Sequence, residues 1–160
     1  MFEPDIVVTA RDTTEPYVVV EVKSRPESLT SSEDGVRDYM VRNNYALGML
    51  VSVGEIWLYR NRFSGYDRDS IERIGGYPLR EFDDLAALAR TTTPALFAAR
   101  LEEAVEDWLR ALPRADLGGL DEGLQRVLRD EVAPYVRDGV VHAAHRRAGL
   151  LRASDVRRRS

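Results

Sequence analysis

Two short β-branched stretches near the start of the chain, residues 4–8 and 18–23, constrain the fold more than any other feature. Both have the composition of β-strands, and the polar segment between them, residues 11–16, ends in proline and has the character of a turn. This separation is too short for the helical crossover that parallel strands require. The two strands are therefore expected to pair as an antiparallel hairpin.

Both strands carry charged residues among apolar neighbours. Asp5 lies on the first strand, and Glu21 and Lys23 lie on the second. A carboxylate in an apolar strand is costly unless another group pairs with it. Side chains alternate between the faces of a sheet, so Asp5 shares a face with Glu21 and Lys23 only if the hairpin loop has an odd number of residues. A turn centred on Thr13 would place Asp5 directly opposite Glu21.

A helix is expected after the second strand. Pro26 prevents the strand from continuing. Thr30 and Glu33 have the spacing of a capping box, with Thr30 as the N-cap and Glu33 reaching back to it. The helix should end near Asn43, and apolar residues spaced by three and four should form its inward face: Val36, Tyr39 and Met40.

Three further strands are expected beyond this helix. Residues 46–53 and 56–60 are apolar runs of strand length. Gly54 and Glu55 between them predict a two-residue type II′ turn with glycine first. Residues 71–79 predict an edge strand.

From about residue 82 the chain is rich in Ala, Leu, Glu and Arg and has a helical pattern. Thr93, followed by Pro94, predicts the start of an amphipathic helix that runs to about residue 112. Its apolar stripe comprises Phe97, Leu101, Ala104 or Val105, Trp108 and Leu112.

Two more helices are expected, one over residues 121–135 with an interruption at Pro134, and one over residues 139–151. The last would carry His142 and His145 on a solvated basic face. The predicted architecture is an α/β core over residues 1–80, with a mixed sheet flanked by helices. An all-helical extension over residues 81–160 would pack on this core or on a second subunit.

Composition limits the class of protein. The chain has 160 residues, 44% of them hydrophobic, which is enough for one domain with a core. The net charge of −4 argues against a basic, non-specific DNA coat. The absence of cysteine excludes disulfides and thiolate zinc sites. No signal-peptide pattern and no apolar run of membrane-spanning length is present, so a soluble, cytoplasmic protein without membrane partners is expected.

The order of these elements resembles a known family. A strand with Pro4-Asp5 followed by a strand with Glu21-Val22-Lys23 is similar to the signature of the PD-(D/E)xK nuclease superfamily. The downstream helix and hairpin strengthen the likeness to the N-terminal nuclease domain of type I restriction-enzyme subunits. The resemblance covers roughly residues 4–62.

The resemblance implies a restriction-endonuclease-like core and a Mg²⁺ site, with Mn²⁺ as a substitute. It implies Asp5, Glu21 and the backbone carbonyl of Val22 as metal ligands, and Asp5, Glu21 and Lys23 as catalytic residues. Lys23 would position or activate the attacking water. Oxygen ligands suit Mg²⁺, and a bound metal supplies hydroxide near neutral pH.

The chain departs from the family pattern in three ways, one of which is a net negative charge that is unhelpful for binding DNA. Relatives carry a helix before the first strand, often with an acidic residue that helps to hold metal, whereas four residues precede Asp5 here and Glu3 is the nearest acidic group. Relatives also place a glutamine about one turn before the helix tyrosine, where this chain has Asp34 and Gly35.

Two functions follow from the sequence. The first is a metal-dependent endonuclease of restriction or defence type that hydrolyses DNA phosphodiester bonds. The second is a catalytically inactive nuclease-fold module for protein assembly or nucleic-acid binding, with a homodimer formed through the helical half. The missing helix and the negative net charge favour the second.

Overall fold

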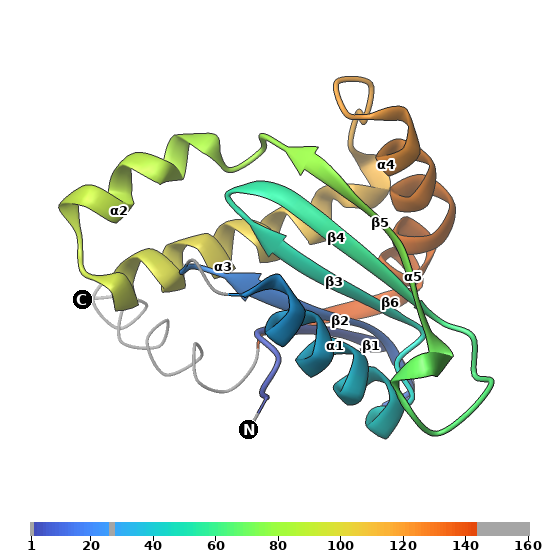
Figure 1. Cartoon of the computed structure of the whole chain (residues 1–160). Helices are drawn as coiled ribbons and strands as arrows, with labels where there is room; N and C mark the ends of the chain where they lie inside the picture. The colour runs from blue at the N-terminus through green and yellow to red at the C-terminus, as the bar shows by residue number, and fades with distance from the viewer. Residues whose placement is uncertain (1, 26–27, 144–160) are drawn as a thin grey trace.

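The computed structural model describes residues 2–25 and 28–143, which form a six-stranded mixed sheet with helices on both faces (Figure 1). The strand order is β5-β4-β3-β2-β1-β6. Strands β2 and β3 are parallel, and every other neighbouring pair is antiparallel. The mixed α/β architecture predicted from the sequence is therefore confirmed.

The strands are β1 (Ile6–Ala10), β2 (Pro16–Lys23), β3 (Leu47–Ser52), β4 (Gly54–Asn61), β5 (Ile71–Leu79) and β6 (Gly139–Ala143). The α-helices are α1 (Leu29–Asn43), α2 (Leu88–Thr91), α3 (Pro94–Ala111), α4 (Glu122–Val127) and α5 (Ala133–Asp138). Short 3₁₀ segments lie at Arg68–Ser70, Asp83–Ala87 and Leu112–Arg114, and a π-helical segment lies at Leu128–Val132. Within the described ranges, no helix is long and apolar enough to cross a membrane.

The β1–β2 hairpin has the predicted register at its open end. Ile6 lies opposite Val20, and the Asp5 N–H donates to the Val20 carbonyl at 3.1 Å. The same register places Asp5 at the level of Glu21. Both carboxylates therefore belong to one face of the sheet.

The turn of this hairpin differs from the prediction. Val8 lies opposite Val18 but Thr9 lies opposite Pro16, so Tyr17 is the extra residue of a bulge in β2. The Ala10 N–H donates to the Glu15 carbonyl at 3.0 Å and closes a four-residue turn that is not centred on Thr13. The four-residue turn and the one-residue bulge together add an odd number of residues. The hairpin therefore has the same register as the odd-numbered loop predicted from the sequence.

Helix α1 covers one face of the sheet and begins earlier than expected. Its N-cap is Ser28, not Thr30, and Glu33 turns inward, so the predicted capping box is wrong. Val36 and Met40 are fully buried as predicted. The helix ends at Asn43, and the C-cap residue Asn44 has the left-handed backbone (φ 60°) that is common at this position.

The β3–β4 hairpin closes one residue earlier than predicted. Val51 lies opposite Ile56, so Val53 and Gly54 are the two turn residues. Only Gly54 has positive φ (106°), which matches a type II turn with glycine second and not the predicted type II′ turn.

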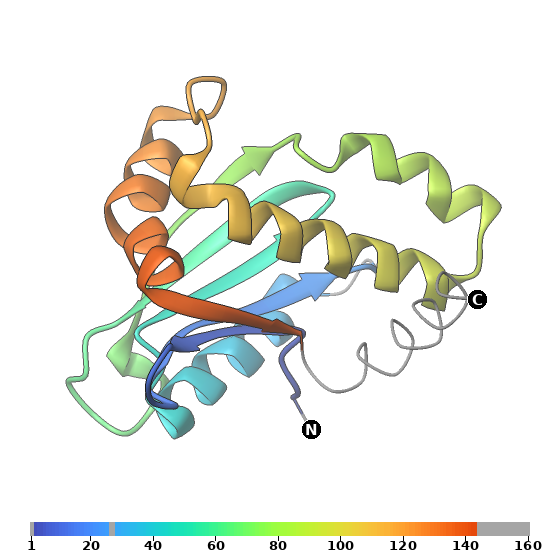
Figure 2. The ribbon, with the colours of Figure 1, turned by 180° about the vertical axis from the view of Figure 1, so that it is seen from behind.

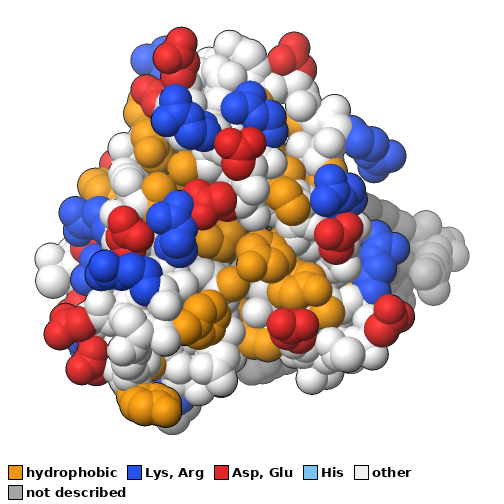
Figure 3. Space-filling view, turned by 90° about the vertical axis from the view of Figure 1, so that its right-hand side faces the viewer, with side chains coloured by type: hydrophobic (Ala, Val, Ile, Leu, Met, Phe, Trp, Pro, Cys, Tyr) orange, Lys and Arg blue, Asp and Glu red, His pale blue; other side chains and the backbone are white. Residues whose placement is uncertain are grey.

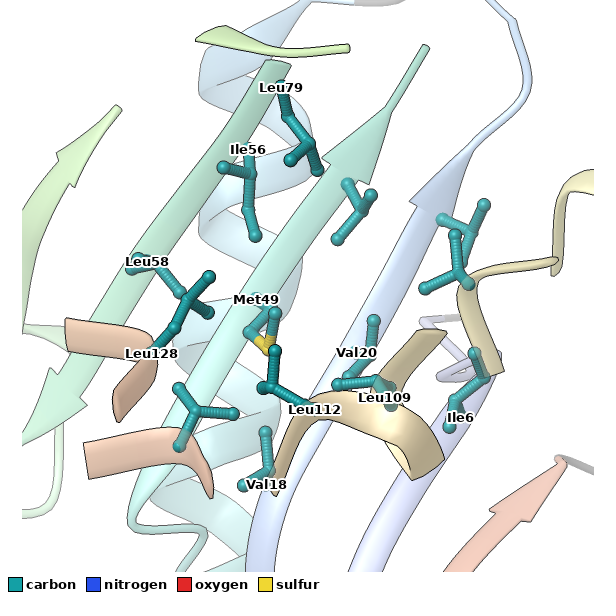
Figure 4. Close-up of a cluster of buried hydrophobic side chains, with 14 of the residues drawn as sticks. Ile6, Val18, Val20, Met49, Ile56, Leu58, Leu79, Leu109, Leu112 and Leu128 are labelled. Carbon is teal, nitrogen blue, oxygen red and sulfur yellow. The ribbon is translucent and has the colours of Figure 1, made fainter. Parts of the chain in front are cut away.

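Helix α3 crosses the other face of the sheet, as the view from behind shows (Figure 2). Thr93 caps it by accepting from the Leu96 N–H, and Pro94 is its first residue, as predicted. Its apolar side packs into the main core against β1–β4, where Leu109 and Leu112 meet Val20 and Met49 (Figure 4). The stripe is therefore buried within this chain, with Leu109 fully covered and Trp108 only partly so.

Helices α4 and α5 form a continuous helical segment through the π-helical turn. Asp121 caps α4 by accepting from the Gly123 N–H at 2.9 Å. Pro134 lies in the first turn of α5, directly after the π-turn. Proline has no N–H for an i→i−4 bond, and the wider turn before it accommodates the missing bond. The predicted interruption at Pro134 thus takes the form of a π-turn.

The segment from Gly139 to Ala143 is a strand, so the helix predicted to start at residue 139 is wrong there. Valines at 140 and 141 favour a strand, and the free edge of β1 supplies backbone partners. The region predicted to be all-helical, residues 81–160, therefore contributes a strand to the sheet. His142 lies within hydrogen-bonding distance of Thr9 (Nε2 to Oγ1, 3.0 Å), whereas His145 and the rest of that predicted helix lie outside the described residues.

Candidate functional site

One open hollow of about 560 Å³ is lined by all four site residues that were predicted from the sequence. It lies where β1 begins and β2 ends. Asp5, Glu21, Val22 and Lys23 contribute to its wall, together with Phe2, Ser24, Arg25, Ser31, Ser32, Gly35, Pro94, Ala95, Ala98 and Glu102. Segments far apart in the sequence therefore meet at one end of the sheet.

Asp5, Glu21 and Lys23 belong to the α1 face of the sheet, whereas α3 contributes to the hollow from the other face. Val7 and Val19 pack with the core beneath α1, whereas Val18, Val20 and Val22 pack in the core on the opposite face. Alternation along the strands then assigns Asp5, which precedes Val7 by two residues, to the α1 face. The same alternation from Val19 assigns Glu21 and Lys23 to that face.

The Asp5 carboxylate is held in place by the backbone of the neighbouring strand. Its Oδ2 accepts a hydrogen bond of 2.7 Å from the Val22 N–H. This bond joins the start of β1 to the end of β2 and restricts the rotamer of Asp5. A carboxylate has further acceptor positions, so this bond still allows the group to serve as a ligand.

Two helices begin at the rim of the hollow. Ser31 and Ser32 come from the first turn of α1, and Pro94 and Ala95 come from the first turn of α3. The N-terminus of a helix carries partial positive charge and unpaired N–H groups, which favour anions nearby. The rim therefore has features that suit a phosphate group.

Charged side chains of both signs line the hollow. Lys23 and Arg25 are basic, whereas Asp5, Glu21 and Glu102 are acidic. Sequence reasoning missed Glu102, because its approach to the first two strands depends on how α3 crosses the sheet. The described ranges contain no group of three His, Cys, Asp or Glu side chains arranged to hold a metal ion.

Lys23 is the only lysine in the chain; the other 22 basic residues are arginines. Arginine is planar and permanently charged, whereas lysine is a compact ammonium that can lose its proton when its surroundings favour the neutral form. The hollow therefore contains the one lysine amine of the sequence. This compositional signal was available in the sequence.

A buried polar network supports α1 behind the hollow. Glu33, only 5% exposed, accepts from the Tyr59 hydroxyl at 2.6 Å and from Arg73 Nε at 2.7 Å, and Arg73 Nη2 contacts its other oxygen. Arg73 also lies 4.9 Å from the centre of the Trp57 ring. The network ties α1 to β4 and β5, and the sequence analysis did not foresee it.

The network controls the ionisation of Glu33. Burial raises the pKa of Glu33, but hydrogen bonds from Arg73 and Tyr59 and the charges of Arg73 and Arg37 outweigh burial. The pKa therefore lies below its usual value of 4.5, and Glu33 is a carboxylate near neutral pH.

A larger hollow of about 770 Å³ lies elsewhere, between the end of β5 and the second half of α3. Phe82 and Trp108 belong to its apolar floor, with their ring centroids 5.9 Å apart. Its rim carries five carboxylates and one arginine: Glu81, Asp84, Asp107, Asp116, Asp121 and Arg80. This excess of negative charge disfavours a phosphate-containing ligand.

Comparisons with family models, with curated proteins and with solved structures find no match for this chain. The residues of the hollow and their arrangement are therefore the basis for assigning a function.

Proposed function

We propose that this protein is a metal-dependent nuclease that hydrolyses DNA phosphodiester bonds. One observation carries the proposal: the strand register places Asp5 at the level of Glu21, and both line an open hollow together with Lys23. Two carboxylates beside one amine match the residue types that the resemblance to PD-(D/E)xK nucleases requires. The restriction or defence role is part of the same proposal.

The donor set is compatible with Mg²⁺. This ion is commonly held by one or two carboxylates and keeps several water ligands, so a site without a third clustered carboxylate is chemically adequate. Asp5 and Glu21 would hold it, with the Val22 carbonyl as a further ligand, and Mn²⁺ would substitute. When bound, the ion would supply an activated water and neutralise phosphate charge.

The residues of the chain have separate tasks in this proposal. The Val22 N–H holds the Asp5 carboxylate in one orientation. The Lys23 ammonium places positive charge where negative charge develops on the phosphate, and an arrangement of this kind is a major source of catalysis. The first turns of α1 and α3 favour the phosphate at the rim.

Glu102 is the third carboxylate of the hollow, and α3 brings it there from a later part of the sequence. We assign Glu102 a positioning role toward water in the hollow. Glu102→Gln should reduce the cleavage rate.

The test is cleavage of supercoiled plasmid by the full chain in Mg²⁺, in Mn²⁺ and in EDTA. The wild type should nick or linearise the plasmid only with metal. Lys23→Ala should be at least about 100-fold slower, the size expected for loss of electrostatic stabilisation. Arg62→Ala, an exposed cation outside the residues that line the hollow, is the matched control and should cleave as the wild type does.

Metal-independent cleavage, or equal rates for the wild type and Lys23→Ala, would overturn the proposal. The assembly alternative is less favoured, because the apolar stripe of α3 that it needed is buried against the chain's own sheet.

A further inference from the structure

We propose that the larger hollow, of about 770 Å³ beside the end of β5, is a second binding site that takes a small organic cation with an aromatic body. This hollow shares no lining residue with the candidate nuclease site, and the assignment does not depend on the proposed function. Its shape, its floor and its charge each support the assignment.

Three segments of the chain surround the hollow. Residues from 78–85, at the end of β5 and beyond it, form one side, residues from 104–111 of α3 form the second, and residues from 115–121 form the third. Figure 1 shows why they meet, because the chain leaves β5, runs through α2 and returns along the sheet as α3. The volume lies in the range of about 300–1,000 Å³ that is usual for small-molecule sites, so a compact ligand fits better than a long polymer.

The floor of the hollow is aromatic and aliphatic. Phe82 is only 3% exposed and packs against Trp108 at an interplanar angle of 83°. Trp108 is only partly buried, and so are the leucines that line the hollow with it, Leu85, Leu117 and Leu120. An accessible indole is the aromatic side chain that attracts organic cations most strongly.

The charge of the rim selects a cation. Five carboxylates and one guanidinium surround the opening, so five negative charges against one positive give a local formal charge of −4. Elsewhere the charges are mixed. On the face shown in Figure 3, acidic and basic side chains lie next to one another, and Arg60 pairs with both Glu72 and Glu131. A rim with an excess of carboxylates attracts a cation and repels an anion of the same size.

Two xanthene dyes of similar size test the charge requirement. Rhodamine 6G is a cation and fluorescein is an anion, and fluorescence anisotropy measures the binding of each dye to the full chain. Rhodamine 6G should bind at least about tenfold more tightly than fluorescein, and its affinity should fall as the salt concentration rises.

The test variant is Glu81→Gln/Asp84→Asn/Asp107→Asn, which neutralises three exposed carboxylates of the rim. It should bind rhodamine 6G at least about tenfold more weakly than the wild type, because the dye loses three nearby negative charges.

The matched control is Asp12→Asn/Glu15→Gln/Asp69→Asn, which neutralises three exposed carboxylates outside the hollow. Both variants lose three negative charges, so they differ in location and not in net charge. The affinity of the control for rhodamine 6G should change by less than about threefold, because distant exposed charges are screened by salt.

The two tryptophans of the chain locate the bound dye. After labelling with 5-fluorotryptophan each gives one ¹⁹F signal, and Trp57→Phe assigns them. Trp108 lines the hollow, whereas Trp57 packs with the core beneath α1. Rhodamine 6G should shift the Trp108 signal and leave the Trp57 signal in place.

Absence of rhodamine 6G binding by the wild type, or fluorescein binding of equal affinity, would overturn the inference. Equal losses in the test and control variants would overturn it, as would a shift of the Trp57 signal without a shift of the Trp108 signal. These outcomes leave the nuclease proposal unaffected, because plasmid cleavage is assigned to residues of the other hollow.

Discussion

The carboxylate of Asp5 and the backbone N–H of Val22 are joined by a hydrogen bond of 2.7 Å between two neighbouring strands. The bond fixes an acidic side chain at the point where β1 begins and β2 ends. It also gives Asp5 a structural role besides its proposed chemical role. The two roles can be separated by substitution.

Asp5→Asn and Asp5→Ala should have different effects on stability and the same effect on cleavage. Asparagine keeps an oxygen that can accept the Val22 N–H, so its cost should be below about 1 kcal/mol, whereas alanine leaves that donor unpaired and should cost about 1–3 kcal/mol. Both should cleave at least about 100-fold more slowly, because both lose the carboxylate charge. Urea unfolding and plasmid cleavage measure the two effects. Normal cleavage by Asp5→Asn would contradict the assignment.

Stability should depend on the ionisation of Glu33. The folded-state pKa of Glu33 is lowered, so its contribution is fully present above about pH 4.5 and is lost as pH falls through the lower folded value. Glu33→Gln should destabilise the fold by about 1–3 kcal/mol at pH 7, since Arg73 loses a charged partner. The difference in unfolding free energy between the variant and the wild type should become smaller below pH 4.5, as measured by urea unfolding.

Tyr59→Phe is the control for this network. It removes the 2.6 Å bond to Glu33 but leaves the contact between Arg73 and Glu33. Its effect should be smaller than that of Glu33→Gln. If the difference in unfolding free energy between Glu33→Gln and the wild type is the same at pH 3.5 and pH 7, ionisation of Glu33 does not contribute to stability.

Gly139→Ala should loosen β6 from β1. A Cβ at this position would lie 2.7 Å from the backbone oxygens of Thr9 and Tyr135, and backbone cannot move away cheaply. A cost of about 1–3 kcal/mol is expected, with faster hydrogen exchange in β6. Gly119→Ala is the control, because its Cβ meets nothing within 4 Å. Equal exchange rates in the two variants would contradict the close packing of β6.

Local patterns predicted much of the fold. Thr93 and Pro94 marked the start of α3 because capping and proline geometry are local properties. Alternation in β2 correctly assigned Glu21 and Lys23 to one face, because that period is fixed by the strand itself.

Long-range contacts account for the failures. Glu33 has the sequence of a capping residue, but buried partners on β4 and β5 draw it inward. Gly139–Ala143 is short and follows a helical segment, and it becomes a strand through its pairing with the free edge of β1. Glu102 reaches the hollow through the path of α3 across the sheet, which local sequence does not encode.

The single lysine permits the most direct test of the central claim, that Asp5, Glu21 and Lys23 form one metal-dependent site. Reductive ¹³C-methylation labels the amine of Lys23, the only lysine side chain in the sequence. Substoichiometric Mn²⁺ should broaden the Lys23 methyl signal in the wild type, and Mg²⁺ should compete. The broadening should disappear in Asp5→Asn and Glu21→Gln. A Lys23 signal that stays sharp in the wild type would contradict the claim. Broadening in the two variants that is as strong as in the wild type would also contradict it.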